Sequence, residues 1–254
     1  MTEPRDRAPV TDLRRSYERA RNLTLGEQIE ECVDLLGHPD VLVSEVLDAF
    51  RFVDEWAETA ALPPPVETEE FGVIDLDDLA NEIFYSTREI AVLNEPCGFT
   101  SFASDVDPLL ELRSSRKKGE RDGLDYVGLT CDPSRTPVLG VVQSDRDTSA
   151  YPLLLRGLAC LSEMAPAAQL ERMNRQYFMG VLGPEPHFDL NVVVWDNWER
   201  NDRASLDTLT RDLAEQVKTA ILECGRQPAI LRDVVCLRMN PKRFDGRMRF
   251  DWRV

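Results

Sequence analysis

The 254-residue sequence contains few lysines and histidines, and it lacks the motifs of several common enzyme classes. Four of its 30 basic residues are lysines, a bias typical of a GC-rich genome, and its two histidines are His38 and His187. No G-x-G-x-x-G or G-x-x-x-x-G-K-[ST] loop is present, so nucleotide-binding folds of those kinds lack their phosphate cradle. No G-x-S-x-G elbow is present either, which argues against a serine hydrolase of that type.

The six cysteines occur singly, and none forms a C-x-x-C pair, so a structural zinc site or a redox motif has no support. We expect them to be reduced, buried residues. No run approaches the roughly 18 apolar residues that a membrane helix needs, and residues 1–15 show no apolar segment typical of a signal peptide. The expectation is a cytoplasmic protein of bacterial type with no membrane association.

Acidic residues outnumber basic ones by 46 to 30, which gives a formal net charge of -16. Such a field disfavours nucleic acid as a partner, since phosphate attraction depends on summed positive charge. It suits a basic protein partner instead. The oligomeric state is not readable from the sequence, and a homo-oligomer stays open.

Residues 1–62 are predicted to form a helical segment. Apolar residues recur at helical spacing around 25–36, with Thr24 and Glu27 placed as a capping box. A break at 37–39 leaves Asp40 to cap the next helix, and a weaker helix is expected around 13–20. Three prolines and an acidic run mark a linker at 63–70, so the predicted core domain covers residues 71–254.

The predicted core begins with a helix at 75–93, followed by two strands at 124–129 and 138–142. Then come a helix at 151–164, a second helical piece to about 177, a strand at 188–195 and a helix at 205–223. Strands at 230–239 and 248–254 complete it. This order predicts an α/β fold: a mixed central sheet flanked by helices on both faces, with an N-terminal helical extension.

One stretch of about forty residues carries a family resemblance. Asp125 lies at the start of a strand, a second strand ends in Gly140-Val141-Val142-Gln143, and a helix follows. This arrangement resembles the core of PD-(D/E)xK (restriction-endonuclease-like) nucleases. In that family the aspartate and a glutamate of the second strand bind Mg²⁺, and a lysine two residues after the glutamate positions the attacking water. The resemblance implies that Asp125 occupies the metal-binding position.

The other family positions are altered. Val141 stands at the glutamate position and Gln143 at the lysine position, and neither can perform that role. If a nuclease site exists, Mg²⁺ would be held by Asp125 with Asp145 or a glutamate of the preceding helix. Arg156 would then replace the lysine. A basic cluster that includes Arg116, Lys117 and Lys118 precedes the Asp125 strand and would lie near a nucleic-acid cleft.

We therefore expect a non-catalytic protein-binding or regulatory protein on a degenerate PD-(D/E)xK-like scaffold, without a cofactor and with a protein partner. The first alternative is a Mg²⁺-dependent nuclease with a rearranged acidic site around Asp125. The second is an acidic chaperone-like or oligomeric interaction protein. In that case, the sheet would not place Asp125 beside Val141.

Overall fold

A computed structural model describes the residues 10–59, 99–106, 123–130, 136–143, 147–176, 180, 182–183, 186–195, 202–224, 230–239 and 248–254. The described helices are α1 (Asp12–Ala20), α2 (Leu25–Gly37), α3 (Pro39–Thr59), α5 (Ala150–Met164), α6 (Ala167–Gln176) and α7 (Asp202–Cys224). The described strands are β1 (Phe99–Val106), β2 (Leu124–Thr130), β3 (Pro137–Val142), β4 (His187–Trp195), β5 (Ile230–Met239) and β6 (Met248–Arg253).

The three N-terminal helices form where the sequence predicts them. The capping box of α2 is present: Glu27 N–H donates to Thr24 Oγ1, and Thr24 N–H donates to the Glu27 carboxylate at 2.8 Å. Asp40 differs from the expectation. It lies within the first turn of α3 rather than capping it, because the helix already begins at Pro39. Proline suits a first helical position, where its missing N–H has no intrahelical partner to lose.

The strands form one mixed sheet in the order β1-β2-β3-β4-β5-β6. Pairing is antiparallel from β1 to β3, parallel from β3 to β5, and antiparallel between β5 and β6. The predicted α/β class with a mixed sheet is therefore confirmed. Every residue of β2 and β3 is buried, and β3 is accordingly apolar along its whole length.

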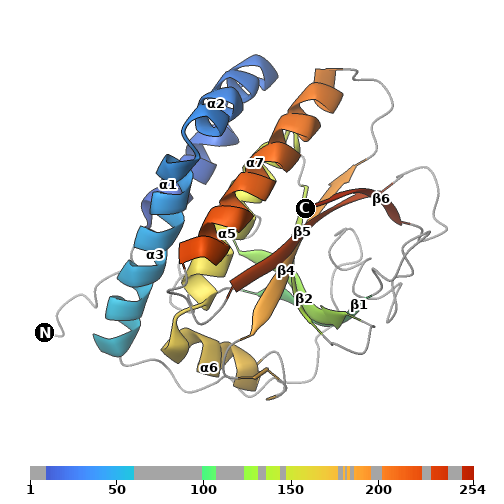
Figure 1. Cartoon of the computed structure of the whole chain (residues 1–254). Coiled ribbons are helices and arrows are strands. Elements are labelled where there is room, and N and C mark those ends of the chain that lie inside the picture. The colour runs from blue at the N-terminus through green and yellow to red at the C-terminus, as the bar shows by residue number, and fades with distance from the viewer. Residues whose placement is uncertain are drawn as a thin grey trace, which may run out of the picture.

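The described helices stand on one side of the sheet (Figure 1). The predicted helix at 75–93 lies outside the described residues, so the expected arrangement on both faces stays a prediction. The chain passes from β3 to β4 through α5 and α6, and from β4 to β5 through α7, moving the same way across the sheet. Parallel crossovers are right-handed, so two crossovers in one direction place their helices on the same face. Helices α1, α2 and α3 pack in turn on α5 and α7.

The N-terminal helices and the sheet share a single buried cluster. It joins Leu13 and Tyr17 of α1 and Val46 of α3 to α5 side chains such as Leu158 and to Val192 of β4. The predicted linker at 63–70 and helix at 75–93 lie outside the described residues, so the domain boundaries remain predictions. Within the described part of the chain, no helix is long and apolar enough to cross a membrane.

Candidate functional site

The site proposed from the sequence centres on Asp125 in β2. The β2–β3 register pairs Tyr126 with Gly140 and Val127 with Leu139. Continuing this register by one residue sets Asp125 opposite Val141, the juxtaposition that the family resemblance implies. The Asp125 carboxylate is only 2% exposed, and it accepts a hydrogen bond of 2.5 Å from the backbone N–H of Val142.

Arg156 supplies the cation that faces Asp125. It lies on α5, is fully buried, and forms an ion pair with the Asp125 carboxylate while donating to the carbonyl oxygen of Val142 at 3.0 Å. Burial opposes the charged guanidinium, but the negative charge of Asp125 raises the pKa of Arg156 above its ordinary value. The pair therefore joins β2, β3 and α5 at one point inside the protein.

Two glycines allow close approaches around this ion pair, one between β3 and β2 and one between α5 and β4. Gly140 has no Cβ, and one added there would lie 2.1 Å from ring carbons of Tyr126. At Gly157, a Cβ would lie 2.5 Å from Leu190 Cδ1, so glycine lets α5 approach β4 beside Arg156. The Tyr126 hydroxyl accepts a hydrogen bond from Asn191 at 3.1 Å, which ties β2 to β4.

The two altered motif positions serve the fold. Val141 is completely buried in the apolar cluster. The Gln143 side chain is also buried, and its Nε2 donates to the carbonyl oxygen of Asp147 at 2.6 Å, holding the chain that leads into α5.

The remaining predicted site residues lie outside the described ranges: Asp145, Arg116, Lys117 and Lys118. Among the residues that are described, no three His, Cys, Asp or Glu side chains gather closely enough to hold a metal ion. Of the sequence-predicted residues, the structure thus brings together Asp125, Arg156, Val141 and Gln143, and the first two neutralise each other.

A second buried ion pair was not predicted from the sequence. Arg14 of α1 donates to Glu163 of α5 through Nε at 2.7 Å and through Nη2 at 2.5 Å, and Nη2 also reaches Cys160 Sγ at 3.4 Å. Burial raises the pKa of the Cys160 thiol to about 11, so this cysteine stays protonated at neutral pH. The sequence signal was that Glu163, like Arg156, stands in a mostly apolar helix, where a buried charge needs a partner.

Polar contacts also connect α2 to the start of α5. Gln28 donates through Nε2 to Thr148 Oγ1 at 2.7 Å, and its Oε1 accepts from the hydroxyl of Ser149 at 2.8 Å. Ser149 is the N-cap of α5, and its hydroxyl oxygen accepts from the N–H of Tyr151. The Tyr151 hydroxyl donates to Glu31 at 2.8 Å. These contacts fix α2 against the sheet domain by hydrogen bonds as well as by apolar packing.

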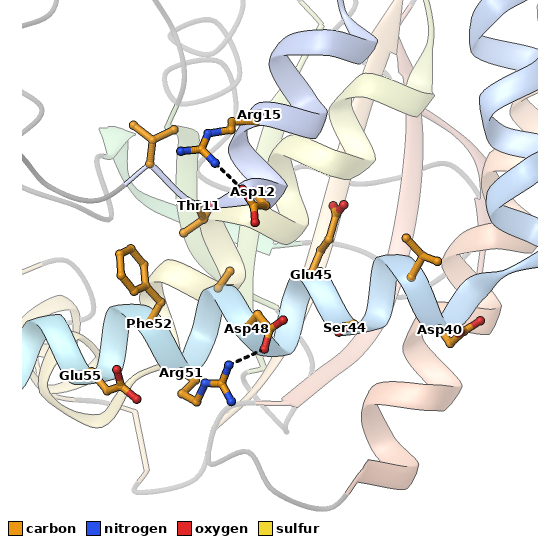
Figure 2. A pocket seen from close by; sticks show the side chains of 13 residues that line it. Thr11, Asp12, Arg15, Asp40, Ser44, Glu45, Asp48, Arg51, Phe52 and Glu55 are labelled. Atoms are coloured by element: carbon orange, nitrogen blue, oxygen red, sulfur yellow. Dashed lines mark hydrogen bonds and ion pairs between the residues drawn. The ribbon is translucent and has the colours of Figure 1, made fainter.

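The surface carries one further feature that sequence reasoning missed, a groove of about 760 Å³ between the start of α1 and the outer side of α3 (Figure 2). Phe52 and Glu45 rise from α3 toward Thr11 and Asp12 at the start of α1. The signal that could have revealed it is the position of Phe52 on the polar side of the α3 pattern.

Comparison of the chain with protein-family models, curated proteins and solved structures found no match in any of the three.

Proposed function

We propose that the chain is a non-catalytic protein-binding or regulatory protein built on a PD-(D/E)xK-like scaffold. The observation that supports this most directly is the ion pair between Asp125 and Arg156. In a metal-dependent nuclease the aspartate at this position would bind a divalent cation. Here its carboxylate forms an ion pair with a guanidinium from α5 and accepts a hydrogen bond from the N–H of Val142.

Burial strengthens this interpretation. Asp125 is 2% exposed and Arg156 is inaccessible to solvent, so a phosphodiester could not reach either group without displacing packed side chains. A metal would also have to compete with a cation that is already in place, and expelling Arg156 would leave its charge unpaired in the interior at a cost of several kcal/mol. The arrangement therefore favours a structural role for both residues.

The test is a calorimetric titration of the protein with Mg²⁺ and with Mn²⁺, and a nuclease assay on the same samples with single-stranded DNA, duplex DNA and RNA. We expect neither saturable metal binding nor cleavage by the wild-type protein. Asp125→Asn is the informative variant, because asparagine keeps an acceptor for the Val142 N–H. Asp34→Asn, which changes an exposed carboxylate on α2, is the matched control.

Metal binding with cleavage in the wild type, both lost in Asp125→Asn and both kept in Asp34→Asn, would overturn the proposal and establish a Mg²⁺-dependent nuclease. If Asp125→Asn does not fold, the double variant Asp125→Asn/Arg156→Met removes both buried charges and is used in its place. The wild-type measurement decides the question in either case.

A further inference from the structure

The groove between α1 and α3 combines exposed apolar side chains with an excess of acidic ones. The exposed large apolar side chains among the described residues are Val10, Val33, Val41, Phe52 and Leu222. Three of them, Val10, Val41 and Phe52, line this groove, and each is close to half exposed, at 50%, 48% and 47%. Clustering of exposed apolar side chains in one concavity is typical of a binding surface.

The charged side chains around these apolar groups are mostly acidic. Five carboxylates line the groove against two arginines, and they belong to Asp12, Asp40, Glu45, Asp48 and Glu55. Arg15 pairs with Asp12 at 2.5 Å and Arg51 pairs with Asp48 at 2.8 Å, so both guanidiniums are already engaged (Figure 2). The excess of negative charge would repel a nucleic acid or an anionic membrane and attract a cationic partner.

The shape suits an elongated occupant. Val41, Glu45, Phe52 and Glu55 follow one another along α3 at helical spacing, while its opposite side, including Val46 and Val53, is buried against the protein. The lined part of α3 runs from residue 40 to residue 55, a length of about 22 Å at 1.5 Å per residue. About four turns of a second helix would span this length with one apolar face toward Phe52.

We propose that this groove binds a basic amphipathic helix of a partner protein, with apolar side chains against Phe52, Val41 and Val10 and lysines or arginines against the surrounding carboxylates. This inference rests on the proposed protein-binding function and specifies its partner class. Phe52 is the central contact, since large aromatic side chains contribute most of the binding energy at such interfaces.

The probe is a fluorescent helical peptide of about 15 residues, roughly four turns, with leucines on one face and lysines on the other. A peptide of the same composition in scrambled order, which has no apolar face, measures general attraction to the acidic protein. Phe52→Ser removes the central contact. The matched control is Val33→Ser. Val33 lies on α2 outside the groove and is about as exposed as Phe52.

Charge is tested by a second matched pair of variants. Asp40→Asn/Glu55→Gln removes two charges from the groove, and Glu30→Gln/Asp34→Asn removes two exposed charges from α2, so net charge changes equally. Affinity is measured by fluorescence anisotropy at low and at physiological salt. All four variants change exposed side chains, and thermal melts confirm that each remains folded.

We expect the ordered peptide to bind more tightly than the scrambled one. Phe52→Ser should weaken binding about tenfold or more, which corresponds to about 1.4 kcal/mol, with no change in Val33→Ser. Asp40→Asn/Glu55→Gln should weaken binding of the ordered peptide more than Glu30→Gln/Asp34→Asn does. Equal affinities for the two peptides, or equal effects of Phe52→Ser and Val33→Ser, would overturn the proposal.

Sedimentation of the wild type alone gives the competing outcome. A dimer that Phe52→Ser dissociates would mean that a second copy of the chain occupies the groove, and the basic partner would be rejected. The peptide experiment and the metal and nuclease test reject different proposals. Absence of peptide binding would reject only the proposed helix-binding role of the groove, whereas Asp125-dependent cleavage would reject only the proposed non-catalytic function.

Discussion

At the scale of single residues, α5 shows how the protein accommodates charge in its interior. All of its residues are buried, yet it carries two charged side chains, Arg156 and Glu163. Each is balanced from a different direction: Asp125 of β2 pairs with Arg156, and Arg14 of α1 pairs with Glu163. Arg156 and Glu163 are seven residues apart, so they lie on the same face of α5 about two turns apart. Because a buried charge is costly without a partner, the two pairs fix this face against β2 at one level and against α1 at the other.

The Asp125–Arg156 pair leads to a prediction about stability. Arg156→Met should lower the free energy of unfolding by about 3–5 kcal/mol, because it leaves a carboxylate buried without its counter-charge. Adding Asp125→Asn should recover most of the loss, since the double variant contains neither charge. Urea denaturation followed by circular dichroism measures both effects.

Arg175→Met is the control for this prediction. Arg175 pairs with Glu171 on the surface of α6, and both side chains are about two thirds exposed, so removing that pair should cost less than about 1 kcal/mol. If Arg156→Met were no more destabilising than Arg175→Met, the buried pair would have no structural role. Arg156 would then be no obstacle to a metal ion at Asp125.

At the scale of whole elements, the N-terminus of α2 gives a pH-dependent prediction. Hydrogen bonds from the hydroxyl and the N–H of Thr24 lower the pKa of Glu27 below its ordinary value. A lowered pKa in the folded state adds stability above the unfolded-state pKa, and this contribution is lost as the pH falls through the folded-state value. Thr24→Ala should therefore be more destabilising at pH 7 than at an acidic pH below the folded-state pKa of Glu27, where its carboxyl is protonated.

Urea melts of wild type and Thr24→Ala at the two pH values test this expectation. Thr208→Ala on α7 is the control, since that exposed hydroxyl donates to the carbonyl oxygen of Ala204 and has no carboxylate partner. Its effect should not depend on pH. A destabilisation by Thr24→Ala that is equally large at both pH values would contradict the capping-box explanation.

The same elements show which parts of the structure could be predicted from the sequence. The helix α2 and its capping box depend on residues three positions apart, so local pattern was sufficient. The strands that carry Asp125 and Val141 were predicted for the same reason. The pairing of Arg14 with Glu163 joins residues 149 positions apart, and no local pattern contains that information. The layering of the helices on one side also depends on strand order, which periodicity does not reveal.

At the scale of the whole molecule, the described elements form three successive layers: the sheet, then α5 with α7, then the N-terminal helices (Figure 1). The middle layer is buried from both sides. Since α5 and α7 contribute to one apolar cluster with α1, α2 and α3, removing the outer layer would expose the apolar side chains of α5 and α7 that it covers. The N-terminal helices therefore act as part of the core.

This layering predicts that the N-terminal helices and the sheet unfold together. Scanning calorimetry should show one transition, with equal calorimetric and van't Hoff enthalpies. Arg14→Met, which removes the α1 partner of buried Glu163, should lower the midpoint of that transition by roughly 10 °C. Arg15→Met, on the exposed side of the same helix, should shift it little. The contrary result would be two transitions, of which Arg14→Met shifts only the first. The N-terminal helices would then fold as an independent unit, and their packing on α5 and α7 would be a contact between two such units.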